Sequence, residues 1–316
     1  MLRSAILAAS RSRGLERAVS NSPISRGVVR RFVGGPDTAS VVGAASSLVE
    51  RGLLVSLDHL GEDTTDAAQA AAVVDAYLKL LDALSHAGLT QRVAPLAARA
   101  EVSVKLSAVG QALPGDGARI ALDNARRIAT AARAVGATVT LDAEDHTTTD
   151  ATLAALSELR ADFPDAGAVL QAYLRRTEGD CADLAGAGSR VRLCKGAYDE
   201  PESVAYRDRL DVDLAYVRCM NILLAGDGYP MWATHDQRLI DIARVRAMSL
   251  GRAPDRHEFQ MLYGVRPEAQ RKLAESGQRV RVYVPYGLQW YGYLVRRLAE
   301  RPANMTFFLR SLVSKS

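Results

Sequence analysis

From about residue 52 onward, the chain alternates between two patterns of hydrophobic and polar positions. Short apolar, β-prone runs are each followed by a longer, Ala-rich segment whose apolar residues recur with helical periodicity. The runs predict eight strands, at residues 53–57, 102–106, 138–142, 168–172, 191–195, 230–234, 258–262 and 281–285. The segments after them predict helices at 65–87, 118–135, 149–160, 179–187, 203–225, 237–250, 267–276 and 289–300.

The ends of these helices carry their own signals. Asp63, Thr64 and Thr65 are the N-cap candidates of the first helix. Pro267 suits the first turn of a helix. Glycines stand where three helices are expected to stop, at Gly88, Gly136 and Gly277.

Eight strand–helix units within about 250 residues indicate a (β/α)8 barrel of the TIM type rather than a doubly wound sheet. Most of the strands are largely apolar, as expected when both faces of a parallel sheet are covered. A dinucleotide-binding fold needs GxGxxG after its first strand. The nearest match, at residues 186–188, precedes a strand and lacks the third glycine. We therefore expect a catalytic barrel at residues 51–316, preceded by an N-terminal helical extension at residues 1–50.

The extension differs from the rest in charge. Residues 1–33 contain seven arginines and a single acid, Glu16. This composition is typical of an organelle-targeting segment, but also of an amphipathic helix that packs under the barrel or contacts anionic lipid. A helical extension is favoured, and targeting is left open.

The composition of the 316 residues narrows the class of protein. Hydrophobic residues make up 48% and charged residues 24%, as in an ordinary globular enzyme. No apolar run approaches the roughly 20 residues that span a bilayer. The net charge is +4, and basic residues alternate with acidic ones along most of the chain, so no long basic tract emerges and we expect no nucleic-acid partner. Three cysteines without a CxxC favour a reducing compartment, with the thiols as small buried side chains.

Active sites of this barrel class form at the carboxyl ends of the strands. Each polar residue there has a structural explanation when taken alone, such as a lysine reaching solvent or an aspartate capping a loop. Together they indicate a functional rim, made of Lys105, Asp142, Glu144, Asp145, Gln171, Tyr173, Arg192, Lys195, Tyr198, Thr234, His235, Asp236 and Tyr283.

The rim does not suit a metal. None of the five histidines forms HxH or HExxH, so no metal site is expected. The cations Lys105, Arg192 and Lys195 favour an anionic cofactor or substrate over a divalent cation.

The last predicted helix carries two adjacent arginines. Arg296 and Glu300 are four residues apart and share a face, with Tyr293 on the same side. A solvated Arg–Glu pair explains this spacing and is favoured from the helix alone. The functional alternative is that Arg296 and Arg297 hold one carboxylate, since their planar forks allow two-point recognition.

The chain resembles the proline dehydrogenase family, whose barrel occurs alone and within bifunctional proline-utilisation flavoproteins. The resemblance rests on eight segments in the family's order: 104–108, 141–145, 171–173, 192–198, 233–235, 258–262, 282–287 and 293–300. They read VKLSA, LDAED, QAY, RLCKGAY, ATH, EFQML, VYVPYG and YLVRRLAE.

The resemblance implies FAD as the cofactor and L-proline as the substrate, oxidised to Δ1-pyrroline-5-carboxylate by hydride transfer from C5 to flavin N5 in the first step of proline catabolism. It implies Asp142 and Arg192 as catalytic-site residues. The implied substrate-binding residues are Lys105, Tyr198, Leu262, Tyr283, Tyr293, Arg296, Arg297 and Glu300. The implied cofactor-binding residues are Ala143, Gln171, Arg192, Lys195, Gly196, Ala197, Thr234 and His235.

Some implications lie outside the barrel. Electrons are expected to pass to a quinone, in a cytoplasmic protein for which peripheral contact with the inner membrane stays open. The chain departs from the family at Asp199, where bifunctional members often carry Trp. We expect no aldehyde dehydrogenase domain. The alternatives to this function are a Schiff-base aldolase that uses Lys105 or Lys195, and a barrel retained as a binding or assembly protein.

Overall fold

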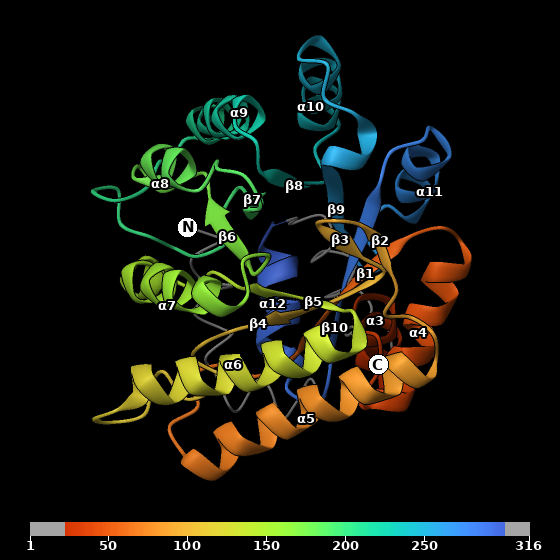
Figure 1. Ribbon diagram of the computed structural model, residues 1–316, viewed down its shortest axis with the longest axis vertical. Coiled ribbons are helices and arrows are strands. Elements are labelled where there is room, and N and C mark those ends of the chain that lie inside the picture. The colour runs from red at the N-terminus through yellow and green to blue at the C-terminus, as the bar shows by residue number, and fades with distance from the viewer. Residues whose placement is uncertain (1–22, 301–316) are drawn as a thin grey trace, which may run out of the picture.

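The computed structural model describes residues 23–300. Parallel strands close into one barrel, in the order β1-β10-β9-β8-β7-β6-β5-β4. Their bounds are β1 Leu54–His59, β4 Ala100–Val104, β5 Thr138–Leu141, β6 Gly167–Gln171, β7 Arg190–Cys194, β8 Tyr229–Ala233, β9 Glu258–Leu262 and β10 Val280–Tyr286. The (β/α)8 barrel expected from the sequence is therefore confirmed (Figure 1).

A helix follows each strand of the barrel, and all of these helices except the last surround it (Figure 1). They are α5 Ala67–His86, α6 Gly117–Val135, α7 Thr149–Asp162, α8 Thr177–Asp183, α9 Arg209–Ala225, α10 Gln237–Ser249, α11 Pro267–Glu275 and α12 Trp290–Glu300, with one-turn 3₁₀ helices at His146–Thr148 and Pro254–Arg256. Two more helices precede β1, α3 Pro23–Phe32 and α4 Thr38–Glu50. The boundary expected at residue 50 stays a prediction, as does everything expected of residues 1–22, which lie outside the described residues.

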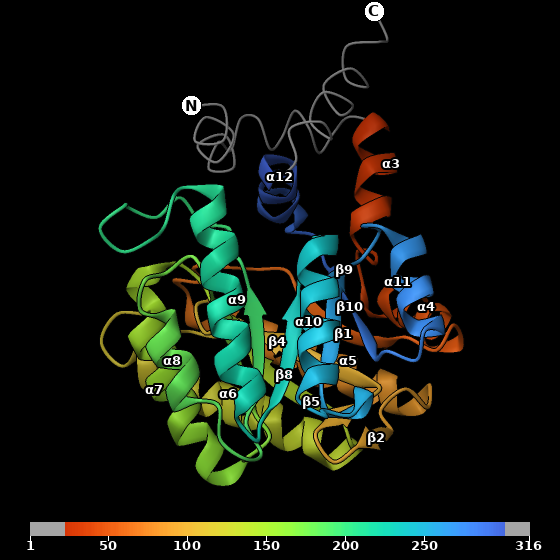
Figure 2. The ribbon, with the colours of Figure 1, turned by 90° about the horizontal axis from the view of Figure 1, so that it is seen from above.

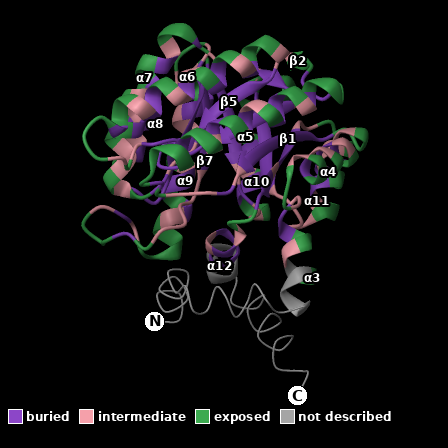
Figure 3. Cartoon of the chain, turned by 90° about the horizontal axis from the view of Figure 1, so that it is seen from below, coloured by how far each residue is buried: buried purple, intermediate pink, exposed green. Residues whose placement is uncertain are grey.

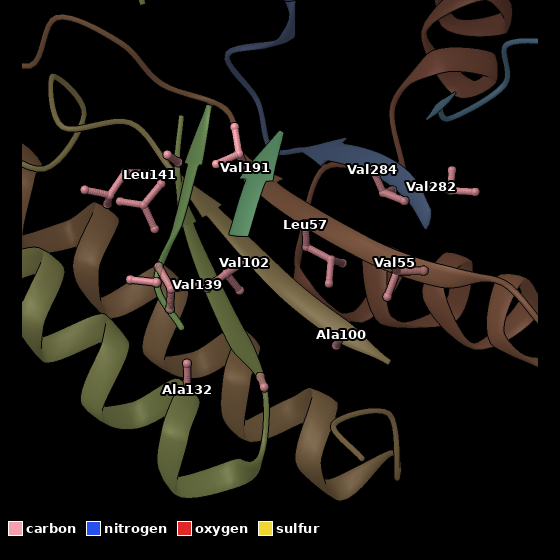
Figure 4. Close-up of a cluster of buried hydrophobic side chains, with 14 of the residues drawn as sticks. Val55, Leu57, Ala100, Val102, Ala132, Val139, Leu141, Val191, Val282 and Val284 are labelled. Carbon is pink, nitrogen blue, oxygen red and sulfur yellow. The ribbon is translucent and has the colours of Figure 1, made fainter. Parts of the chain in front are cut away.

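The apolar residues of the strands face the helices. Val55 and Leu57 of β1 and Val102 of β4 belong to the main core, which fills the layer between barrel and helices (Figure 4). Burying apolar surface in this layer contributes roughly 25 cal/mol per Å². Figure 3 shows the result, with buried strands inside and exposed outer faces on the helices. The alternate positions of the strands face the barrel interior, and many of them are polar.

The helices begin within two residues of the expected positions, except for α9. The N-cap of α5 is Asp66, which accepts a 3.0 Å hydrogen bond from the Gln69 amide, so the candidates Asp63, Thr64 and Thr65 are wrong. Asp63 has φ of 52°, whereas an N-cap residue is typically extended. Helix α9 begins at Arg209, six residues later than expected, because the preceding residues form a loop.

A short antiparallel pair, β2 Arg92–Ala94 with β3 Ala97–Ala98, was not expected from the sequence. Among residues 23–300, no helix has the length and apolar content needed to cross a bilayer.

The mouth of the barrel is partly covered by helix. In Figure 2, the arrowheads of β7 and β8 point toward α12, which lies over the carboxyl ends of the strands with α3 beside it. Tyr293 of α12 packs with Val33 and Leu60 in a small apolar cluster. This packing brings α12 onto the end of the barrel where the active site is expected.

Candidate active site

One cavity of about 720 Å³ lies at the carboxyl ends of the strands. Most of the residues expected at the site line it: Lys105, Asp142, Ala143, Gln171, Arg192, Lys195, Gly196, Ala197, Tyr198, Thr234, His235, Leu262, Tyr283 and Tyr293. Expected residues from β4 to β10 are thus brought together in one space. Their individual roles stay predictions.

Three expected residues cannot be placed by their side chains. Arg296, Arg297 and Glu300 belong to α12, whose backbone is described, but their side chains lie outside the described part of the chain. The helix itself is informative, because Tyr293 lines the cavity and Arg296 and Arg297 follow it by about one helical turn.

Lys105 is paired with an acid that the sequence reasoning missed. Its Nζ donates to both oxygens of Asp58, at 2.8 and 2.7 Å, and the two side chains are 8% and 1% exposed. Burial alone would lower the pKa of the Lys105 ammonium, but the Asp58 carboxylate outweighs burial and raises that pKa. Lys105 is therefore held as a cation whose charge Asp58 balances. An amine must be neutral to form a Schiff base, so this pairing argues against the aldolase alternative at Lys105.

Arg192 is held from two sides by residues of β1 and β4 and by Asp142, which follows β5. Its Nη2 donates to Glu101 Oε1 at 2.6 Å and to Ser56 Oγ at 3.0 Å. Its Nη1 donates to Ser103 Oγ at 2.8 Å and approaches Asp142 Oδ1 at 3.4 Å. Strands β1, β4 and β5 are not neighbours of β7, so these contacts cross the barrel interior.

Tyr283 contacts both Asp142 and Arg192. The Tyr283 hydroxyl donates to Asp142 Oδ2 at 2.7 Å, and Ser103 Oγ donates to the same oxygen at 3.2 Å. The Arg192 guanidinium carbon lies 5.2 Å from the centre of the Tyr283 ring, within cation–π range. Burial and the Asp142 carboxylate raise the pKa of the Tyr283 phenol, which stays protonated as a donor.

Lys195 lies at the β7 side of the cavity between two acids. Its Nζ contacts Asp213 and lies 3.1 Å from Asp236 Oδ2. Arg238 also bonds both acids, at 2.6 and 2.7 Å. The hydrogen bonds from Arg238 and Lys195 lower the pKa of Asp236. The group thus balances two cations with two carboxylates.

The loop after β7 is packed against the end of β6. Gly196 has φ of 113°, and a Cβ there would overlap the ring of Tyr173, which also lines the cavity. Glycine is required at this position for both reasons. Glu200 anchors the same loop, because its Oε1 accepts from the His146 amide at 2.9 Å and from the Tyr173 hydroxyl at 3.2 Å.

Two polar side chains are oriented by backbone groups. Gln171 donates to the carbonyl of Glu144 at 2.8 Å. His235 Nε2 accepts from the Leu262 amide at 2.9 Å, which requires a nitrogen without a proton. His235 therefore keeps its proton on Nδ1 when neutral.

Several residues of this region were missed from the sequence, namely Ser56, Asp58, Glu101, Ser103, Asp213, Arg207 and Arg209. Cys194 also differs from the expectation of three buried thiols, because it is partly exposed and lines the cavity. The described residues contain no group of three or more His, Cys, Asp or Glu side chains arranged to hold a metal ion.

A closed (β/α)8 barrel whose inward charges converge on one cavity at the carboxyl ends of its strands defines a TIM-barrel enzyme. The family model for proline dehydrogenase matches residues 41–310, and the chain belongs to this family of oxidoreductases. It is 40% identical over 288 residues to proline dehydrogenase of Deinococcus radiodurans, covering 90% of both chains. It is 35% identical over 286 residues to proline dehydrogenase 1 of Bacillus subtilis strain 168, covering 90% of this chain and 91% of the relative.

Solved structures show the same barrel. The chain is similar to proline utilization A (PutA) of Bdellovibrio bacteriovorus inactivated by N-propargylglycine, with a TM-score of 0.81 and 25% identity over 92% of this chain. It also resembles the D778Y mutant of Bradyrhizobium japonicum PutA, with a TM-score of 0.72 and 23% identity. The chain spans about a third of the length of these structures, 34% and 32%.

Proposed function

We propose that this enzyme is an FAD-dependent proline dehydrogenase that oxidises L-proline to Δ1-pyrroline-5-carboxylate, the first step of proline catabolism. The observation that carries the proposal is the cavity of about 720 Å³, which gathers the residues of the family's motifs at the carboxyl ends of the strands. Its volume lies within the range of cofactor and ligand sites.

Three features of the cavity fit a flavin cofactor. The Nε of Arg192 is buried and has no hydrogen-bond partner among the described residues. A buried donor without an acceptor costs about 1–3 kcal/mol, so an acceptor brought by a cofactor would stabilise this site. Gly196 and Tyr173 form a close-packed wall in which the backbone at 196 carries no side chain. Arg207 and Arg209 also line the cavity, beside the charge-balanced Lys195, and their basic side chains suit an anionic diphosphate.

When bound, FAD supplies the acceptor for the hydride that leaves C5 of proline. The Arg192 cation stabilises negative charge in this space, and Ser56, Glu101, Ser103 and Asp142 keep it oriented. Leu262, Tyr283, Tyr198 and Tyr293 exclude water from the pyrrolidine ring.

We infer that α12 holds the substrate carboxylate, and the charge balance of the described residues supports this inference. Lys105 is neutralised by Asp58, and Arg192 is shared between Glu101 and Asp142. A carboxylate in this cavity needs additional positive charge. Arg296 and Arg297 follow Tyr293 on α12 and would provide it, with Lys105 beside them and Glu300 orienting Arg296.

The electrons of each turnover have to leave the enzyme. We propose that they pass to a quinone, by peripheral contact of a cytoplasmic protein with the membrane that holds the quinone.

The absorbance spectrum of the purified protein tests the cofactor and the substrate together. We expect a yellow protein with the two visible bands of oxidised FAD, which anaerobic addition of L-proline bleaches while D-proline serves as the control. Colourless protein that FAD cannot reconstitute would refute the proposal. A flavoprotein that proline does not bleach would refute the substrate alone.

A further inference from the structure

Two glutamate–arginine pairs lie in the barrel interior beneath the cavity. Glu101 pairs with Arg190, and Glu258 pairs with Arg281 at 2.6 Å. All four side chains are 0% exposed, and none of them lines the cavity. Burying a charge is costly unless it is paired and hydrogen-bonded, so each pair needs its partner to persist.

The two pairs differ in their relation to the site. Glu101 shares its carboxylate between Arg190, which binds Oε2, and the cavity-lining Arg192, which binds Oε1 at 2.6 Å. Ser56 Oγ donates to the same Oε1 at 2.8 Å. Glu258 has no hydrogen bond to Arg192 among those of the described residues, and its one cavity-lining partner is Gln260, at 2.7 Å.

Glu101 determines which N–H groups of Arg192 remain for a ligand. Ser56 and Glu101 take the Nη2 hydrogens, while Ser103 and Asp142 take those of Nη1. Nε alone has no partner within the described residues. Without the Glu101 carboxylate, the Nη2 edge would keep only the weaker bond to a neutral hydroxyl, and the guanidinium could turn about its long side chain.

Glu101 remains charged despite complete burial. Burial alone would raise its pKa, but Arg190, Arg281 and Arg192 outweigh burial and lower that pKa below its ordinary value. The acceptor beneath Arg192 is therefore a permanent carboxylate across the working pH range.

We propose that Glu101 is a positioning residue for the reaction: anchored by Arg190, it fixes the guanidinium of Arg192 at the base of the cavity. The inference rests on the proposed function, in which Arg192 acts on FAD and on the charge that develops there. Glu101 itself touches neither substrate nor cofactor.

The test compares two double variants that each remove one buried pair and leave the net charge unchanged, Glu101→Met/Arg190→Met and Glu258→Met/Arg281→Met. Replacing a buried ion pair by apolar residues of similar volume is often neutral for stability. For each variant, we would measure the Kd of the apoprotein for FAD, the limiting rate of flavin reduction by proline, and the proline concentration that gives half of that rate.

We expect the Glu101 double variant to reduce its flavin about tenfold to a hundredfold more slowly, as for loss of a charge-assisted hydrogen bond. It should also bind FAD more weakly, at an unchanged half-saturating proline concentration. The Glu258 double variant should match wild type in all three. Equal losses in both variants, or wild-type behaviour of the Glu101 variant, would overturn the proposal.

If the double variants do not fold, two milder single variants, Glu101→Asp and Glu258→Asp, test the same proposal. Glu101→Asp keeps the charge but shortens the side chain, so it should slow reduction by less than the double variant, while Glu258→Asp should not slow it. Equal effects of the two aspartate variants would also overturn the proposal. Wild-type protein that binds no FAD would instead refute the proposed function.

Discussion

The buried pair of Lys105 and Asp58 allows a quantitative prediction. Asp58→Asn keeps the shape of the side chain and one acceptor oxygen but removes its charge. The Lys105 ammonium then stays buried without its counter-ion, because its two bonds of 2.7 and 2.8 Å to Asp58 become at most one neutral hydrogen bond. The variant therefore measures how much one buried carboxylate at the cavity contributes to the free energy of unfolding.

Removing one partner of a buried ion pair typically destabilises a protein by about 3–5 kcal/mol. The remaining amide oxygen and the nearby Asp142 carboxylate soften the loss, so we expect the lower end, about 3 kcal/mol at neutral pH. The matched control is Asp123→Asn. Asp123 lies 3.3 Å from Arg119 in a pair that is 52% and 65% exposed, and its removal should change stability by less than about 1 kcal/mol.

The pH dependence of stability tests the same ion pair independently, through the direction in which stability changes with pH. In wild type, the folded-state pKa of Lys105 lies above its ordinary value, so the stabilisation is complete below about pH 10.4 and is lost only as the pH rises through the folded-state pKa. In Asp58→Asn, the carboxylate that raises the pKa of Lys105 is gone, so burial lowers that pKa. The folded variant then releases its proton before the unfolded chain does, so its stability rises with pH. The gap to wild type should narrow in alkaline solution.

Urea unfolding at several pH values, followed by the fluorescence of Trp232 and Trp290, measures both effects. FAD has to be held at one concentration, because a ligand that binds only the folded state adds stability. A gap below about 1 kcal/mol at neutral pH, comparable to the surface control, would refute the assignment of a buried, charge-balanced pair. A gap that widens with pH would refute the sign of the pKa shift.

Three further predictions concern other parts of the cavity. Gly196→Ala should lose FAD and at least about 1 kcal/mol of stability, because of its positive φ and the neighbouring ring, whereas Gly179→Ala, with open space around it, should be neutral or stabilising; equal FAD content in the two would contradict this reasoning. Burial raises the pKa of Glu144 to about 6, so the stability of wild type should fall by on the order of 2 kcal/mol as the pH rises from about 4.5 to 6. Glu144→Gln should abolish this slope in pH-dependent unfolding, and an unchanged slope would exclude Glu144 as its source. Arg297→Met should lower kcat/KM for proline about tenfold to a hundredfold, with partial recovery in Arg297→Lys, and unaltered steady-state kinetics would exclude a carboxylate contact.

The elements of the barrel could be predicted because local patterns encode them. The strand expected at residues 258–262 is β9, and the other strands lie within about two residues of their predicted bounds. Strand β4 is shifted toward the N-terminus, so Lys105 follows the strand instead of lying within it. The hydrophobic run marks where a strand is buried, but hydrogen bonds to β1 and β5 decide where it ends.

The loop after β7 could not be predicted from local pattern. Residues 203–208 continue the helical periodicity of α9, but long-range contacts hold them as a loop. The Tyr206 amide donates to the carbonyl of Tyr173 at 2.7 Å, and Arg207 donates to the carbonyl of Glu200 at 2.6 Å. Tyr173 follows β6, and Glu200 is held in turn by the His146 amide and the Tyr173 hydroxyl. Tertiary contacts therefore outweigh helix propensity here, as they commonly do.

The acids of the barrel interior were missed for a different reason, and a stricter reading of the strands would find them. Successive residues of a strand point to opposite faces, and every second residue shares a face, so Arg192 shares the inward face with Arg190. An arginine inside a closed barrel cannot reach water and has to be paired with an acid from another strand. The same alternation places Glu101 on the inward face with Lys105, and Asp58 on that face of β1. Each interior cation thus requires an acid at an inward position, and the residues that supply this charge are the ones that now orient Lys105 and Arg192 in the cavity.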